Sequence, residues 1–276
     1  MSVLFARRCQ VAVDDVLVDG LRVQFDVSKS LTKHPNTCDI KISNLSESTR
    51  RQMKSRRALV RLMAGYEDTI AQIFSGAART TDHARESAEW VTHIQCGDGE
   101  TQFVFSRVSE SFAPGASVAD IIARIASRLG VSAGNVPAQL AARGFRGNLE
   151  QFAQGYVAHG KASTELDKIM RSAGFEWSIQ DGALQILKPD QATKKQAVLL
   201  TPDTGLVGSP EHGAPNKKGK PSVMKAKSLL QPSIHPGGEV SIQSRSVDGH
   251  FRVSKVKHTG DTAGGHWYTE LEAHPL

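Results

Sequence analysis

The C-terminal third of the chain decides the fold, and its first part, Val198–Glu211, reads VLLTPDTGLVGSPE. Further along, Leu229–Ser244 reads LLQPSIHPGGEVSIQS, and Phe251–Trp267 reads FRVSKVKHTGDTAGGHW. In the first two segments, short apolar or alternating runs are separated by Pro202, Pro210, Pro232 and Pro236, each set beside glycine, aspartate or serine, and in the third the alternating run ends in a glycine-rich turn. This pattern is typical of short strands joined by tight turns. The prolines lie between the runs, where a missing N–H costs a strand ladder least. The stretch therefore predicts an all-β barrel or sandwich.

The N-terminal part, residues 1–110, has the same β character. Leu21–Val27 alternates apolar and polar residues, which indicates a strand with one face in water. Cys38–Ile42 alternates in the same way, and Ser46 after it is expected to cap a short, polar surface helix. Gly97-Asp98-Gly99 indicates a hairpin in which Phe103–Val108 pairs back on the preceding strand. We expect an antiparallel, tube-like β-barrel domain over residues 1–110.

Residues 111–188 change to a mixed pattern, which predicts an inserted α+β module. A first helix is expected behind Ser117, with Asp120 completing a capping box and Gly130 ending the helix. Its apolar stripe falls at helical spacing and consists of Val118, Ile121, Ile122, Ile125 and Leu129.

Two further helices and a hairpin are expected in the same module. Asn148 is expected to cap the second helix, whose apolar stripe would be Leu149, Phe152, Tyr156 and Val157. Ser163 is expected to cap the third helix, which Gly174 ends. Phe175, Trp177 and Ile179 then alternate before an Asp181-Gly182 turn. The module is interpreted as a spacer domain, and a peptidoglycan-binding domain is the alternative.

A short polar linker after Pro189 leads into the C-terminal part, residues 189–276. Here we expect a second tube-like β-barrel domain, so that the whole chain is mainly β with an α+β module between two antiparallel barrels. The segment His212–Ser222 is rich in glycine, proline and lysine and is predicted to be a mobile loop.

Composition narrows the class of protein. The chain has 276 residues, which suits one large or two to three small domains, and 39% of them are hydrophobic, so a real core is expected. It contains no apolar run long enough for a membrane span, and its N-terminal charges come too early for a signal peptide. The three cysteines, Cys9, Cys38 and Cys96, are far apart. They predict buried free thiols in a reducing cytoplasm.

The formal net charge of +6 is concentrated in two clusters. The first comprises Arg50, Arg51, Lys54, Arg56 and Arg57, and the second Lys217, Lys218 and Lys220. Each is interpreted as a solvated surface, because neither contains an aromatic residue on which a base could stack. A weak contact of the first cluster with DNA phosphates is the alternative.

No established catalytic motif is present, so no catalytic, cofactor-binding or metal-binding residue is predicted. The chain lacks G-x-S-x-G, H-E-x-x-H, C-x-x-C and a phosphate-binding glycine loop. His258, Asp261 and His266 are the nearest approach to a metal-ligand set, but they lack a fourth ligand. The competing interpretation is a turn in which Asp261 hydrogen-bonds its own backbone.

The order of the short motifs along the chain resembles the central baseplate hub, or tail-tip hub, proteins of tailed phages and prophages. The motifs that carry the resemblance are Leu200-Thr201-Pro202, Thr204-Gly205-Leu206, Ser209-Pro210-Glu211, Ser228–Pro232, Pro236-Gly237, Phe251-Arg252-Val253, His258–Asp261 with Trp267, and, earlier in the chain, Ile42–Ser46 and Met63–Tyr66.

The resemblance implies a structural protein, not an enzyme, that acts in the virion tail baseplate after assembly in the host cytoplasm. It implies a homotrimer with a pseudo-sixfold ring of barrels and a channel for DNA passage. The partners it implies are the tail tube or tube-initiator protein, the central spike and other baseplate proteins, with weak channel contact to DNA. A tail-associated protein that binds or degrades the cell wall is the alternative function.

Overall fold

A computed structural model describes residues 6–53, 57–99, 103, 105–141, 154–193, 196–213 and 223–276. The chain folds into two compact units. Unit 1 comprises Met1–Ser30, Asn36–Gly97 and Asp190–Leu276, and unit 2 comprises Leu31–Pro35 and Asp98–Pro189. The predicted loop tip 214–222 and the second helix of the module from Asn148 to Phe152 lie outside the described residues.

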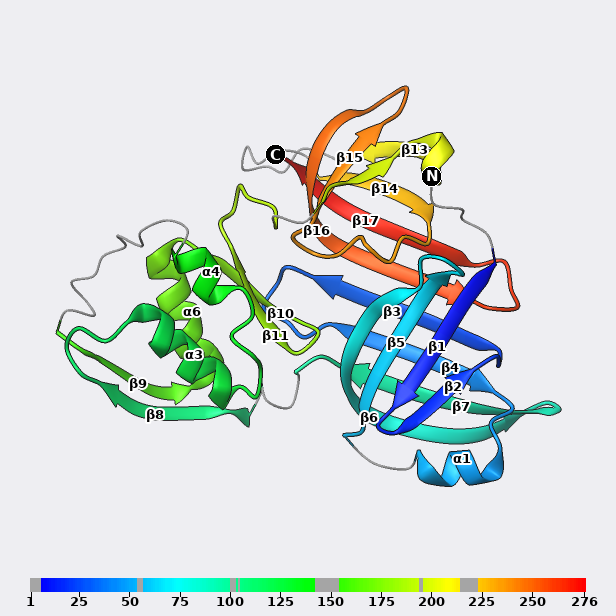
Figure 1. Ribbon diagram of the computed structural model, residues 1–276, viewed down its shortest axis with the longest axis horizontal. Helices are drawn as coiled ribbons and strands as arrows, with labels where there is room; N and C mark the ends of the chain where they lie inside the picture. Colours follow the sequence, from blue (N-terminus) through cyan, green and yellow to red (C-terminus); the bar gives the residue numbers. More distant parts are fainter. Residues whose placement is uncertain are drawn as a thin grey trace. The chain divides into compact units, whose positions relative to one another are not determined.

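Unit 1 is built on one 13-stranded sheet, whose pairings are antiparallel except that of β12 with β15 (Figure 1). The strands are paired in the order β13-β14-β17-β16-β3-β4-β7-β6-β5-β1-β2, and β15 pairs with both β16 and β12. The strands from the N-terminal part are β1 (Arg7–Val13), β2 (Val16–Asp19), β3 (Val23–Ser30), β4 (Thr37–Ser43), β5 (Leu59–Tyr66), β6 (Ala71–Glu86) and β7 (Glu89–Gly97). Those from the C-terminal part are β12 (Val198–Leu200), β13 (Leu206–His212), β14 (Met224–Leu229), β15 (Glu239–Gln243), β16 (Asp248–Asp261) and β17 (Trp267–Pro275).

The alternation seen in the sequence sets the two faces of this sheet. In β3, Val23, Phe25 and Val27 are buried, while the residues between them are more exposed. The buried faces form two apolar clusters, one mainly of N-terminal residues and one of C-terminal residues. The pairing of β3 with β16 joins the two parts of the chain in one sheet. The expected mainly β fold is therefore confirmed, while closure into two barrels stays a prediction.

Two short helical segments accompany the sheet. α1 (Glu47–Gln52) begins as predicted, because the Ser46 hydroxyl accepts a hydrogen bond from the Thr49 N–H. The 3-10 helix η1 (Pro202–Thr204) has a capping box between Thr201 and Thr204. It ends at Gly205, whose φ of 103° is in the left-handed region that favours glycine.

Unit 2 has the α+β composition that the sequence predicted. It contains α3 (Val118–Arg128), α4 (Val136–Ala141) and α6 (Ala162–Ala173), with two two-stranded sheets: β8 (Arg107–Phe112) with β9 (Tyr156–Lys161), and β10 (Glu176–Gln180) with β11 (Ala183–Leu187). The expected stripe on α3 is buried in a separate apolar core of this unit. The helices α3 and α6 pack on the β8–β9 pair (Figure 1). None of the helices in the described part of the chain is long and apolar enough to cross a membrane.

The predicted hairpin after Gly97 is wrong. β7 pairs with β4 and β6, whereas β8, which follows Gly97 in the chain, pairs with β9. The reason is a contact with a distant part of the chain: the Asp98 carboxylate accepts hydrogen bonds from the backbone N–H groups of Asp181 (2.6 Å) and Gly182 (2.9 Å). Asp98 is thus held by the β10–β11 turn within unit 2, and the Gly-Asp-Gly segment does not make a tight turn of its own.

Three details of the expected helices are also wrong. Tyr156 and Val157 lie in β9 and not on a helix, because their strand pairs residue by residue with β8. α6 begins one residue before Ser163, with Lys161 at its N-cap position. Ser117 is the N-cap residue of α3, but its side chain makes no capping hydrogen bond, so the capping box with Asp120 does not form.

Candidate functional site: a polar face across the large sheet

The face of the sheet opposite the apolar cores is polar where β3 and β16 meet. On β16, Val256, His258 and Gly260 are buried, so Lys257, Thr259 and Asp261 point to the other face. The β3–β16 register then places Thr259 beside Asp26. The polar face therefore extends from C-terminal strands to N-terminal strands without interruption.

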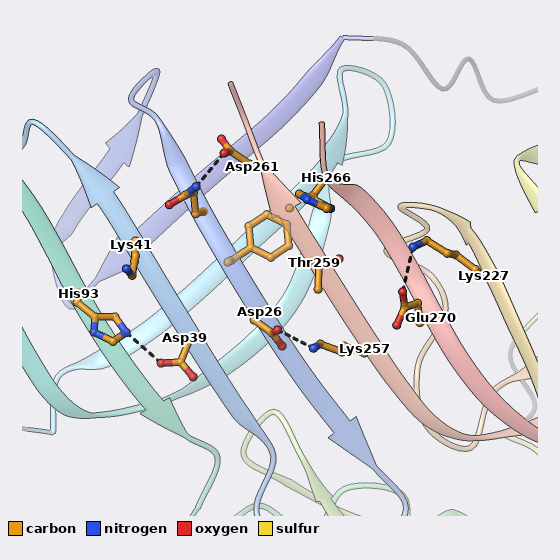
Figure 2. Close-up of a pocket in the computed structure, with 13 residues that line it drawn as sticks. Asp26, Asp39, Lys41, His93, Lys227, Lys257, Thr259, Asp261, His266 and Glu270 are labelled. Atoms are coloured by element: carbon orange, nitrogen blue, oxygen red, sulfur yellow. Dashed lines mark hydrogen bonds and ion pairs between the residues drawn. The ribbon is translucent and has the colours of Figure 1, made fainter. Parts of the chain in front are cut away.

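A shallow depression of about 460 Å³ lies on this face (Figure 2). Its lining comes from β3, β4, β7, β14, β16, β17 and the turn after β16, and consists of Gln24, Phe25, Asp26, Asp39, Lys41, His93, Lys227, Lys257, Thr259, Gly260, Asp261, His266 and Glu270. We call this set the polar face.

Ion pairs between neighbouring strands neutralise most of these charges. Lys227 on β14 lies 3.1 Å from Glu270 on β17, measured between Nζ and Oε1. Lys257 on β16 lies 2.8 Å from Asp26 on β3, and Figure 2 shows both contacts as dashed lines.

Polar pairs continue on the N-terminal strands, one between the neighbours β4 and β7 and one that reaches from β4 past β7 to β6. His93 Nε2 lies 3.1 Å from an oxygen of Asp39, and Lys41 Nζ lies 3.8 Å from Glu86. Basic and acidic side chains therefore alternate across the polar face, and a phosphate arriving there would have to compete with carboxylates already in place.

Asp261 is the most strongly held carboxylate of the polar face. It accepts hydrogen bonds from Arg22 at 2.8 and 3.2 Å and from the Gln24 amide at 2.9 Å. The hydrogen bond from Arg22 is the largest cause that holds the pKa of Asp261 well below its usual value. Asp261 also accepts from the backbone N–H of Ala263, so the predicted turn around its own backbone is confirmed.

His258 faces away from Asp261, into the core of the sheet. Its Nδ1 lies 2.9 Å from the Thr269 hydroxyl, and burial lowers the pKa of the imidazole to about 3. His266 lines the polar face with Asp261. Residues three positions apart on a strand point to opposite faces, so the candidate metal set His258, Asp261 and His266 does not converge. Within the described ranges, no group of His, Cys, Asp or Glu side chains is arranged to hold a metal ion.

The three cysteines are buried and free, as predicted. Burial raises the pKa of the Cys9 and Cys96 thiols to about 12, and the pKa of Cys38 well above its usual value. Because the thiolate is the reactive form, these cysteines are poor nucleophiles and act as small apolar residues of the core.

The structure brings an aromatic residue to the first basic cluster, which sequence reasoning missed. The guanidinium of Arg50 on α1 lies 4.3 Å from the ring centre of Trp90 on β7. Arg51 is paired with Glu47. The cluster members Lys54 and Arg56 and the whole second cluster, Lys217, Lys218 and Lys220, lie outside the described residues. Trp90 is 40 residues from Arg50 in the sequence, so only the fold could place it there.

The arrangement of the polar face suits contact with a large surface. It is open, it draws on seven segments of the chain, and its charged side chains neutralise one another across strand pairs. Bond-making chemistry would instead need a nucleophile, a base and an orienting group within hydrogen-bond reach of one another.

Solved structures of tail proteins have the same fold. The chain aligns with a 43 kDa tail protein of prophage MuSo2 from Shewanella oneidensis at a TM-score of 0.67 and 9% identity, covering 98% of both chains. A tail protein from Neisseria meningitidis aligns at a TM-score of 0.65 and 11% identity, covering 98% of this chain and 96% of that one.

A third similar structure comes from a secretion machine. It is an Escherichia coli component of the type VI secretion system, described as structurally similar to the T4 tail proteins gp27 and gp5. It aligns at a TM-score of 0.57 and 10% identity, covering 96% of this chain and 76% of that one. At these identities the likeness concerns the fold alone.

The family follows from the sequence match. No curated protein matches the chain at a significant level. The model of the baseplate hub gp41 family, however, matches residues 3–272, nearly the whole chain. The expected resemblance is thereby confirmed, and membership of a structural family supports a non-enzymatic role. The chain belongs to the baseplate hub gp41 family of phage tail proteins.

Proposed function

We propose that this protein is the structural hub of a phage baseplate, a homotrimer that adapts the tail tube to the central spike. A ring of sixfold character must meet a spike of threefold character. Three copies of a chain with two β parts provide six similar positions around one axis, which solves this mismatch.

The observation that carries the proposal is the continuous pairing of β3 with β16. It joins N-terminal strands with their own apolar cluster to C-terminal strands with another cluster. On this proposal, residues 1–110 and 189–276 form the two tube-like parts, and residues 111–188 form the inserted spacer module.

The polar face fits the wall of a channel for DNA. A wall of unpaired lysines would retain the phosphate backbone, and a wall of unpaired carboxylates would repel it. Because Lys257 is paired with Asp26 and Lys227 with Glu270, this surface should neither retain nor repel DNA strongly. Weak contact with passing DNA is the behaviour that such a surface favours.

The proposed partners are the tail tube or tube-initiator protein on one side, the spike on the other, and further baseplate proteins around the ring. Assembly would take place in the cytoplasm of the bacterial host. The three buried free thiols are consistent with that reducing compartment.

Complementation of a phage that lacks its hub tests the proposal. Wild-type protein is expected to restore complete tails in electron micrographs. Purified protein should leave peptidoglycan intact in a zymogram. The hub proposal would be wrong if the purified chain degrades peptidoglycan and tails assemble normally without it. The alternative, a cell-wall-degrading tail protein, would then take its place.

A further inference from the structure

The hairpin of β6 and β7 extends beyond the strands that flank it, and Figure 1 shows its turn projecting from the sheet. β6 pairs with β5 only as far as Ala77, and its second half pairs with β7 alone. From Arg79 to Glu86 every residue is exposed or half-buried. Among the described residues no strand pairs with the outer edge of Thr80–Glu86, so this part of β6 is an edge strand of the sheet. We call β6 from Thr80 together with β7 as far as Gln95 the arm.

The arm carries the most exposed tryptophan of the chain. Trp90 is 41% exposed, whereas Trp177 and Trp267 are 5% and 1% exposed. A large, rigid aromatic side chain in this position is costly to leave in water and is typical of the centre of a protein interface.

The indole is held in place before any partner arrives. The backbone of Trp90 exchanges two hydrogen bonds with Asn44, whose N–H donates to the Trp90 carbonyl at 2.7 Å and whose side-chain oxygen accepts from the Trp90 N–H at 3.3 Å. Arg50 lies over the ring, and its guanidinium is itself held by the Leu45 carbonyl at 2.7 Å. A side chain fixed in this way loses little entropy on binding.

On the face of the arm that carries Trp90, the unpaired charge is positive. Arg85 lies directly opposite Trp90 across the β6–β7 pair and forms no ion pair with any described residue. Of the nearby carboxylates, Glu86 is paired with Lys41 and Glu47 with Arg51. The exposed Asp82 and the half-buried Glu89 point to the opposite face of the β6–β7 pair, because Asp82 lies opposite His93 and Glu89 opposite Glu86. A partner that complements this surface must therefore bring carboxylates.

A protein segment fits this surface better than a nucleic acid does. Single strands are bound by several aromatic platforms in succession, and among the residues of the arm Trp90 is the one Phe, Tyr or Trp. One face of its ring is already occupied by Arg50. An open strand edge, in contrast, offers backbone hydrogen bonds to an extended peptide.

We propose that the arm docks an extended, acidic segment of another baseplate protein. The segment lies along the outer edge of β6, places a carboxylate on Arg85 and packs an apolar side chain against Trp90. This contact adds to the proposed hub function and is separate from trimer formation.

Photo-cross-linking in assembled tails tests the contact directly. A photoreactive amino acid replaces Ala84, which is exposed on the arm, and a control replaces Leu59, which is 49% exposed on β5. After irradiation, mass spectrometry identifies the cross-linked peptide. We expect an acidic segment of a different protein from position 84 and not from position 59. Cross-links only to this chain, to a basic segment or to DNA would overturn the proposal.

The yield of complete tails from variants of the arm is the second measurement. Arg85→Glu and Trp90→Ala should each lower the yield of complete tails at least tenfold, while Arg61→Glu and Leu59→Ala on β5 should leave it unchanged. The mass of the purified oligomer is measured for all four variants. Loss of the trimer in Arg85→Glu would assign the arm to contact between copies and overturn the proposal. Restoration of tails by reversing the cross-linked carboxylate of the partner to arginine would support it.

Discussion

Single residues on β16 show how one strand serves two environments. His258 is buried beside Thr269, and Asp261 lies on the opposite face with Arg22. Burial and charge therefore move the pKa of each side chain below its usual value for different reasons: burial for the imidazole, and hydrogen bonds from Arg22 for the carboxyl.

His258 should make the protein sensitive to mild acid. Because its folded-state pKa is lowered to about 3 from the usual value of 6.5, the unfolded chain binds a proton that the native chain does not bind between these two values. The free energy of unfolding is therefore highest above the unfolded-state pKa of His258, and it falls as the pH decreases below that value. The loss approaches about 1.4 kcal/mol per pH unit within the window.

Denaturant unfolding of wild type and His258→Gln between pH 7 and about 4 measures this effect. The free energy of unfolding should fall more steeply with decreasing pH for the wild type than for His258→Gln. Parallel curves over that range would show that His258 is protonated equally in both states.

Gly260 marks a close approach inside the sheet. A Cβ built on it would lie 2.3 Å from Phe25 and 2.8 Å from Trp267. Gly260→Ala should therefore cost about 1–3 kcal/mol through overpacking. Gly265→Ala is the matched control, because its Cβ meets nothing within 4 Å. Thermal unfolding compares the two, and an equal midpoint would contradict the packing described for Phe25 and Trp267.

At the scale of elements, helix α3 tests the interpretation of the inserted module. Its stripe, predicted from helical spacing, is buried, and Ile125 is fully inaccessible. Ile125→Asp should lower the free energy of unfolding by several kcal/mol, because it places a carboxylate in an apolar core. Ser127→Asp, two residues further on the exposed side, should cost far less. Similar thermal midpoints for the two variants would show that the facing of α3 is wrong.

The elements also show which features the sequence could predict. Strands such as β3 and β4 follow from alternation, because one face meets water and the other meets the core. The alternation does not show which strands pair with one another. Gly97-Asp98-Gly99 has the composition of a turn, but Asp98 is used by the backbone of Asp181 and Gly182, more than 80 residues away.

The polar face was beyond sequence reasoning for the same reason. Asp26 and Lys257 are far apart in the sequence, and they meet only because β3 and β16 pair in one particular register. The stack of Arg50 on Trp90 likewise depends on where α1 lies beside β7. Local sequence patterns do not show which of these distant residues will meet. The lack of an established catalytic motif, in contrast, is visible in the sequence itself.

At the scale of the whole molecule, membership of the baseplate hub family and the joined β parts lead to one central claim, that three copies form a ring. The proposed ring would need large obligate interfaces, so the separate subunit should associate at micromolar concentration. The inserted module, whose core is separate, is expected to tolerate changes on its surface without loss of the ring.

Mass measurement by light scattering during size-exclusion chromatography tests this claim most directly. We expect a particle of about 89 kDa, three times the chain mass of 29.8 kDa, for the purified protein alone or together with its tube and spike partners. A particle that holds only one or two copies under all of these conditions would contradict the claim.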